Sequence, residues 1–173
     1  MKLKAGDCFV VRGDTSLSYL IRVFGNFWSS DGECTFNHAG IILDREGNTF
    51  ESLNRIGIYN LETYKGKQIL IVRHKKMTSA RFLDGFASVN HLNGVIYPWW
   101  RLALHLFHLA RFFNRSGIPV CSELVGMFEN GAGLRKVFWG LTPDNLADEW
   151  RISKHYNIVH EGVWEWSTPT NGL

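Results

Sequence analysis

The sequence lacks the long apolar runs, the even set of cysteines and the strong charge that mark several large classes of protein. No uncharged apolar run in the 173 residues approaches the ~20 residues needed to span a membrane. Its 3 cysteines are an odd number and their spacing fits no zinc motif, so neither a disulfide framework nor a structural metal is expected. The formal net charge of +3 predicts no nucleic-acid partner.

The composition and length are typical of a globular domain. The chain is 45% hydrophobic and 20% charged. A chain of this size buries roughly 70% of its unfolded surface, and no repeat or linker divides it, so we expect a single domain over 1–173. The first residues, 1–7, reach a charge before any apolar segment begins. We therefore expect no secretory signal and a cytoplasmic location.

Short apolar stretches separated by turn residues predict both strands and helices. We expect strands over 6–12, 38–43, 48–53, 56–61 and 68–73, and a closing hairpin of 156–160 and 163–166 around Glu161 and Gly162. Helical spacing predicts helices over 17–24, 78–93, 99–114, 121–130 and 143–150. Helices combined with a compact run of consecutive strands predict an α+β fold with a mostly antiparallel sheet.

Cys121 has the sequence context of a nucleophile. Pro119 precedes it, and apolar residues at 121, 124, 125 and 128 predict a helix that begins almost at the thiol. A helix N-terminus favours the thiolate, and its free N–H groups can receive an oxyanion. Cys8 and Cys34 lack this context and are interpreted as structural.

A thiol nucleophile needs a base, and the base needs an orienting group. His38 begins a strand in which Ala39 and Gly40 leave room for another element, and Glu51 lies on the returning strand. If paired residue numbers sum to an odd value such as 91, His38 faces Leu53, and Glu51 lies diagonally on the same face. A sum of 89 would place Glu51 directly opposite His38, whereas an even sum would place the two on opposite faces.

Several short motifs occur together over most of the chain. They are Gly6-Asp7, Asn37-His38-Ala39-Gly40-Ile41, Phe50-Glu51-Ser52, Gly57, Gly94-Val95-Ile96-Tyr97 and Val120-Cys121-Ser122-Glu123-Leu124-Val125. Their order resembles the circularly permuted branch of the NlpC-type cysteine peptidases, which are papain-like. The resemblance implies a mostly antiparallel sheet or small barrel packed against helices, with the nucleophile at a helix N-terminus.

The resemblance also implies roles for individual residues. It makes Cys121 the nucleophile, His38 the base and Glu51 the residue that orients the imidazole ring. Tyr97 matches a tyrosine that in relatives lies near the oxyanion, where the backbone N–H of Cys121 is the other donor. Relatives often have an aspartate after that tyrosine, whereas this chain has Pro98. The implied activity is hydrolysis of an amide in a peptide or cell-wall-type peptide through an acyl-enzyme, without cofactor or metal.

The segment Trp99–Phe113 is unusually aromatic and has Arg and His residues at roughly helical spacing. Three interpretations stay open: a helix buried on most sides, a membrane-surface helix with a basic stripe, or a partner interface. His105 and His108 have a spacing that could bind a metal, but no carboxylate or cysteine nearby completes a site.

Two other functions are compatible with the same motifs. One is a lipid-directed thiol acyltransferase or lipase, because the lecithin:retinol acyltransferase group shares the permuted architecture, and the aromatic segment would favour it. The other is a catalytically silent binding module of the same fold. The presence of cysteine, histidine and glutamate together speaks against the silent module.

Overall fold

The computed structural model describes residues 2–13, 35–96 and 119–165. The strands are β1 (Cys8–Val11), β2 (His38–Ile42), β3 (Asn48–Ser52), β4 (Ile56–Asn60), β5 (Gln68–His74) and β6 (Tyr156–Val163). The helices are the 3-10 helix η1 (Leu61–Tyr64) and the α-helices α2 (Ser79–Asn90), α4 (Cys121–Gly131) and α5 (Pro143–Ile152). The predicted helices over 17–24 and 99–114, together with Cys34 and Tyr97, lie outside the described residues.

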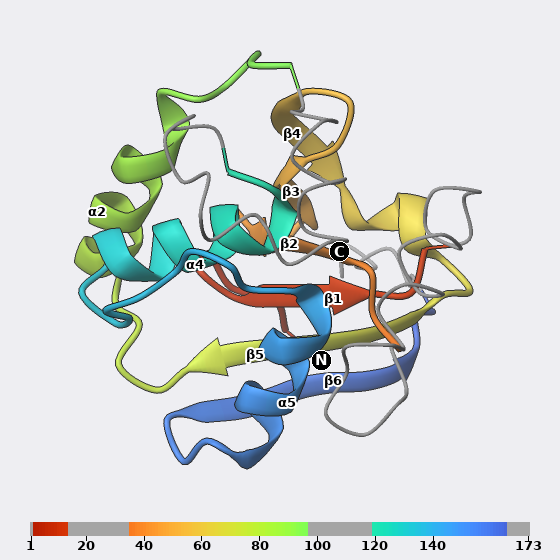
Figure 1. Cartoon of the computed structure of the whole chain (residues 1–173). Helices are drawn as coiled ribbons and strands as arrows, with labels where there is room; N and C mark the ends of the chain where they lie inside the picture. Colours follow the sequence, from red (N-terminus) through yellow and green to blue (C-terminus); the bar gives the residue numbers. More distant parts are fainter. Residues whose placement is uncertain (1, 14–34, 97–118, 166–173) are drawn as a thin grey trace, which may run out of the picture.

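The strands form one six-stranded sheet in the order β4-β3-β2-β1-β5-β6, in which all neighbours are antiparallel. The predicted α+β class with an antiparallel sheet is therefore confirmed. Figure 1 shows α4 and α5 in front of the sheet and α2 at its side. Among the described residues, no helix is both long and apolar enough to cross a membrane.

Both faces of the sheet bury apolar side chains, and the alternation along β1 shows how the strand sequence achieves this. Cys8 and Val10 point into the larger core, which contains residues of α2, α4 and α5. Phe9 and Val11 point into a second core on the other face, which includes Trp164. A strand covered on both faces requires a continuous apolar run, because successive side chains point in opposite directions.

Local signals correctly predicted where the helices α2 and α5 begin. Thr78 caps α2 by accepting a hydrogen bond from the backbone N–H of Arg81. Thr142 caps α5 in the same way, and Pro143 occupies the first helical position. Helix α2 ends at Asn90, three residues before the predicted end.

The predicted closing hairpin around Glu161 and Gly162 is wrong. Strand β6 continues through both residues, which pair with Leu70 and Ile69 of β5. A β-bulge in this ladder is absorbed at Ile71/Val72, and Gly162 stays in the strand with φ 134°. The hydrogen-bonding edge of β5 needs partners along its whole length, and this non-local requirement overrides the local turn signal.

Candidate functional site

The register of the β2–β3 hairpin brings His38 and Glu51 together. Gly40 pairs with Glu51 and Ile41 with Phe50, so paired residue numbers sum to 91, which is the odd register. His38 and Glu51 therefore share one face of the sheet as diagonal neighbours. His38 Nε2 lies 2.6 Å from Glu51 Oε2, which is within hydrogen-bonding distance.

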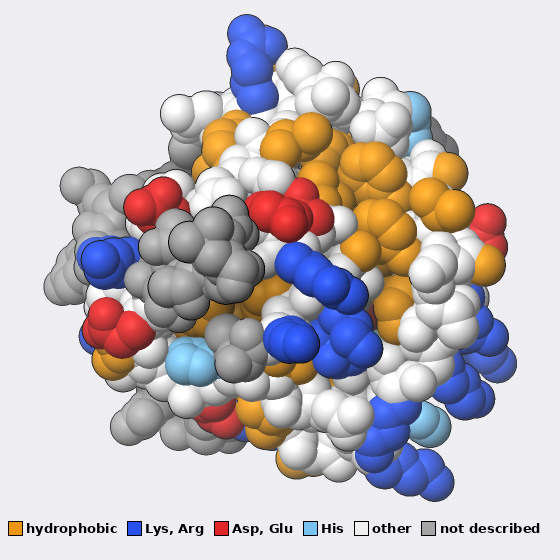
Figure 2. Space-filling view, turned by 180° about the vertical axis from the view of Figure 1, so that it is seen from behind, with side chains coloured by type: hydrophobic (Ala, Val, Ile, Leu, Met, Phe, Trp, Pro, Cys, Tyr) orange, Lys and Arg blue, Asp and Glu red, His pale blue; other side chains and the backbone are white. Residues whose placement is uncertain are grey.

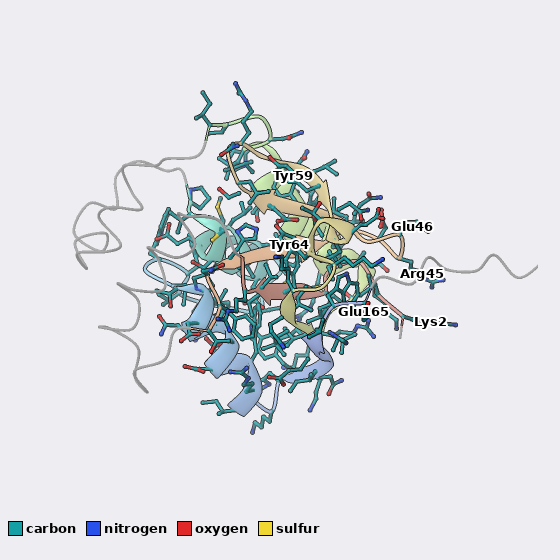
Figure 3. All side chains as sticks on the ribbon, turned by 90° about the vertical axis from the view of Figure 1, so that its right-hand side faces the viewer. Lys2, Arg45, Glu46, Tyr59, Tyr64 and Glu165 are labelled. Carbon is teal, nitrogen blue, oxygen red and sulfur yellow. The ribbon has the colours of Figure 1, made fainter. Side chains whose placement is uncertain are left out.

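Glu51 is fully buried and its carboxylate is held by two further hydroxyl groups. The hydroxyl of Thr49 donates to Oε1, and that of Tyr64 donates to Oε2 at 2.5 Å. With His38, three side chains therefore converge on one buried carboxylate, so that its oxygen atoms have hydrogen-bond partners in place of water. In Figure 3, Tyr64 lies among the strands, whereas Arg45 and Glu46 extend from the edge of the molecule.

Thr49 and Tyr64 were not predicted as residues of the site. Thr49 could have been found, because it lies two residues before Glu51 on the same strand and so faces the same side. Tyr64 ends η1, which directly follows the edge strand β4. Nothing in the local sequence indicates that its hydroxyl returns to Glu51.

Cys121 is the first residue of α4 and is largely buried. The turn before it is held by Glu123, whose carboxylate accepts hydrogen bonds from the backbone N–H groups of Val120 and Gly140. Cys121 lies close enough to His38 to help raise the pKa of its imidazole. Since Nε2 of His38 contacts Glu51, Nδ1 is the ring nitrogen left to face the sulfur.

The protonation of His38 reflects these neighbours. Burial lowers the pKa of His38, but hydrogen bonds and charge interactions with Cys121 and Glu51 outweigh it and raise the pKa to about 10. Burial, together with the charge of Glu51, raises the pKa of Tyr64 well above its ordinary value. Tyr64 therefore keeps its proton and acts as a donor, and His38 is favoured as an imidazolium.

Aromatic rings and a glycine keep the imidazole in place. The ring centroids of Phe9 and Tyr64 lie 6.4 Å and 6.0 Å from that of His38. Gly40 makes room for these neighbours, since a Cβ there would lie 2.6 Å from the Phe9 ring and 2.8 Å from Glu51 Cγ. The predicted close approach at Gly40 is thus confirmed, and the approaching groups belong to the candidate site itself.

We expect Gly40→Ala to destabilise the protein by about 1–3 kcal/mol, because neither Phe9 nor Glu51 can move away within the buried sheet. Thermal unfolding measures the change. Gly57→Ala is the matched control, since a Cβ on that strand glycine would lie 3.5 Å from its nearest neighbour, an ordinary contact. Equal effects of the two substitutions would contradict the packing assigned to Gly40.

The remaining predicted residues divide into two groups. Cys8 is buried in the larger core, as a structural cysteine should be, and burial raises the pKa of its thiol. Tyr97 and the segment 99–113 lie outside the described residues, so their roles stay predictions. Within the described ranges, no group of three or more His, Cys, Asp or Glu side chains is placed to hold a metal ion.

Comparisons with known proteins place the chain by its fold. No family model matches it, and no curated protein matches its sequence. A solved structure does match: the metalloprotein yiiX from Escherichia coli O157:H7, a DUF1105 protein. The TM-score is 0.61 at 13% sequence identity, and the match covers 96% of this chain and 100% of the other. The two proteins therefore share a fold.

Proposed function

We propose that the protein is a thiol hydrolase with a permuted papain-like fold, in which Cys121, His38 and Glu51 form a catalytic triad that cleaves an amide bond. The observation that carries this proposal is the chain of contacts from the α4 N-terminus to the sheet. Cys121 lies close enough to His38 to help raise the pKa of its imidazole, and His38 Nε2 lies 2.6 Å from a buried carboxylate held by two hydroxyl groups. Such an order of nucleophile, base and orienting group is typical of acyl transfer.

The reaction begins with attack of the Cys121 thiolate on the carbonyl carbon, which forms a carbon–sulfur bond and places negative charge on the carbonyl oxygen. The backbone N–H of Cys121, which the first turn of α4 leaves without a carbonyl partner, can donate to that oxygen. As the carbon–nitrogen bond breaks, His38 transfers its proton to the departing amine. The acyl group is then bound to sulfur as a thioester.

Water completes the cycle. Once the thioester forms, the thiolate charge that raised the pKa of His38 is gone, so the neutral imidazole can accept a proton from water. The resulting hydroxide equivalent attacks the thioester, the carbon–sulfur bond breaks and the acid leaves. Throughout, Glu51 holds the ring with Nδ1 toward the sulfur.

The pKa of His38 predicts how turnover depends on pH. Because this pKa is raised to about 10, His38 keeps the proton needed by a leaving amine below that pH and loses it above. Hydrolysis of an acyl p-nitroanilide should therefore fall as the pH rises through about 10. Glu51→Gln removes one of the groups that raise the pKa, so the alkaline limb should move to lower pH.

The matched control is the p-nitrophenyl ester of the same acyl group, whose leaving group departs without a proton. Its hydrolysis should show a weaker alkaline limb than the anilide in the unmodified protein. An alkaline limb at the same pH in Glu51→Gln and in the unmodified protein would contradict the role given to His38 and Glu51.

A further inference from the structure

A group of cations lies where β5 ends and β6 begins. The backbone N–H of Lys75 donates to the carbonyl of His155 at 2.8 Å, which joins the loop after β5 to the loop before β6. The rings of His74 and His155 stack with their centroids 6.0 Å apart. Figure 2, which views the molecule from behind Figure 1, shows Lys and Arg side chains gathered toward the lower right edge, with a histidine among them.

A third loop, after α4, belongs to the same surface. Arg135 bonds to Glu129, which accepts a hydrogen bond from Tyr156, and the Tyr156 ring packs edge-on against His74. Burial lowers the pKa of His74, and nearby positive charges lower it further; these are His155, Arg81, Lys76 and Arg135. Positive charges from three loops and from the start of α2 therefore all lie near the His74 ring.

This surface concentrates the positive charge of the protein. The segments 74–83, 134–138 and 150–160 contain seven Lys and Arg residues and no Asp or Glu. Arg135 and Arg151 pair with glutamates. The other five have no ion pair within the described part of the chain: Lys75, Lys76, Arg81, Lys136 and Lys154. The whole chain carries a net charge of +3, so its charges other than these five cations sum to −2.

We call this group of unpaired cations the basic end. Exposed aliphatic side chains lie on the same loops and helix ends. Among the described residues, the three most exposed large hydrophobic side chains are Ile152 (86%), Val137 (69%) and Leu83 (63%). Ile152 lies two residues from Lys154 and Val137 lies next to Lys136, whereas Leu83 follows Arg81 by two residues on α2 and points to a different side of that helix. Asp84, beside Leu83, reduces the positive charge there without reversing it.

The combination indicates the kind of partner. Lysine side chains around exposed aliphatic groups suit a lipid interface, where the aliphatic groups enter the headgroup region and the ammonium groups remain at its surface. Surfaces that bind single-stranded nucleic acid instead present aromatic rings for base stacking. The most exposed apolar groups at the basic end are aliphatic, which favours the lipid surface.

We propose that the basic end is a docking surface for a membrane that contains anionic phospholipid. It involves loops 74–78, 134–138 and 152–155 and does not use Cys121, His38 or Glu51. It is therefore independent of the proposed reaction. Docking brings negative lipid headgroups to the unpaired lysines and places Ile152 and Val137 at the depth of the headgroups.

Vesicle flotation of the full chain tests the proposal. The protein should float with phosphatidylcholine vesicles that contain phosphatidylserine and remain in solution with phosphatidylcholine alone. Lys75→Gln with Lys76→Gln should weaken the binding roughly 25-fold, since each cation at an anionic surface contributes roughly five-fold. Val137→Ser with Ile152→Ser should also weaken it, because the aliphatic contacts are lost while the charge is unchanged.

The matched control is Arg12→Gln with Lys65→Gln, which removes two exposed charges at the opposite end of β5. This variant should bind vesicles nearly as well as the unmodified protein. Equal losses in the two charge variants, or no binding to the anionic vesicles, would overturn the proposal. Binding to a single-stranded oligonucleotide that exceeds vesicle binding and is unaffected by Ile152→Ser would assign the basic end to nucleic acid instead.

Discussion

Replacing Cys121 with alanine should abolish acyl transfer, with a loss of roughly 10⁴-fold or more in the rate of acylation. The thiol supplies the atom that forms the covalent bond, and the other cysteine in the described residues, Cys8, is buried in the larger core. The measurement uses p-nitrophenyl acetate, which transfers an acetyl group to an activated thiol. Release of p-nitrophenol and the intact mass of the protein report the same event independently.

The control for this result is Cys8→Ala. Cys8 is buried in the larger core, and burial raises the pKa of its thiol, which keeps it protonated. The Cys8→Ala protein should acquire one acetyl group on the peptide that contains Cys121. If Cys121→Ala still gains the acetyl group on a cysteine, the nucleophile has been assigned to the wrong residue.

Replacing Glu51 with alanine should lower the free energy of unfolding by about 3–5 kcal/mol. The substitution leaves the Tyr64 hydroxyl, the Thr49 hydroxyl and His38 Nε2 without their acceptor at a fully buried position. For a chain of this size, the loss corresponds to a fall of roughly 10 °C in the unfolding midpoint. Differential scanning calorimetry or thermal circular dichroism measures it.

Two further variants serve as controls for the unfolding midpoint of Glu51→Ala. Glu46→Ala removes an exposed carboxylate from the β2–β3 turn and should leave the midpoint nearly unchanged. Glu51→Gln keeps the volume and one acceptor oxygen, so its midpoint should lie between those of Glu51→Ala and the unmodified protein. If Glu51→Ala unfolds at the same temperature as Glu46→Ala, the three hydrogen bonds do not stabilise the fold.

Together these experiments separate the proposed catalytic role of the site from its structural role. Cys121→Ala should remove acylation and leave the fold stable, because the side chain lies at a helix start and keeps one methyl group there. Glu51→Ala should reduce both activity and stability. Flotation of the Cys121→Ala protein keeps the membrane proposal independent of both, since the basic end lies elsewhere in the fold.

Elements with strong local signals were predictable. The β2–β3 hairpin followed from two apolar stretches around a polar turn, and α4 and α5 followed from helical spacing and terminal residues. Strand β6 was not, because Glu161 and Gly162 have the local character of a turn, whereas their conformation depends on pairing with β5. The basic end was not predicted either, because its cations come from three separate segments that only the fold brings together.

The sequence by itself determined which residue types were available for chemistry. It placed a cysteine at a helix start and limited the His38–Glu51 relationship to one of two parities, because strand side chains alternate with a period of two. Only the tertiary structure decided between the parities and brought the hydroxyl of Tyr64 to Glu51. Hydrogen bonds across a sheet join residues distant along the chain, so neither result could be obtained from local spacing. Cys121 meets His38 for the same reason: packing of α4 against β2 and β3 joins a helix start to a strand start.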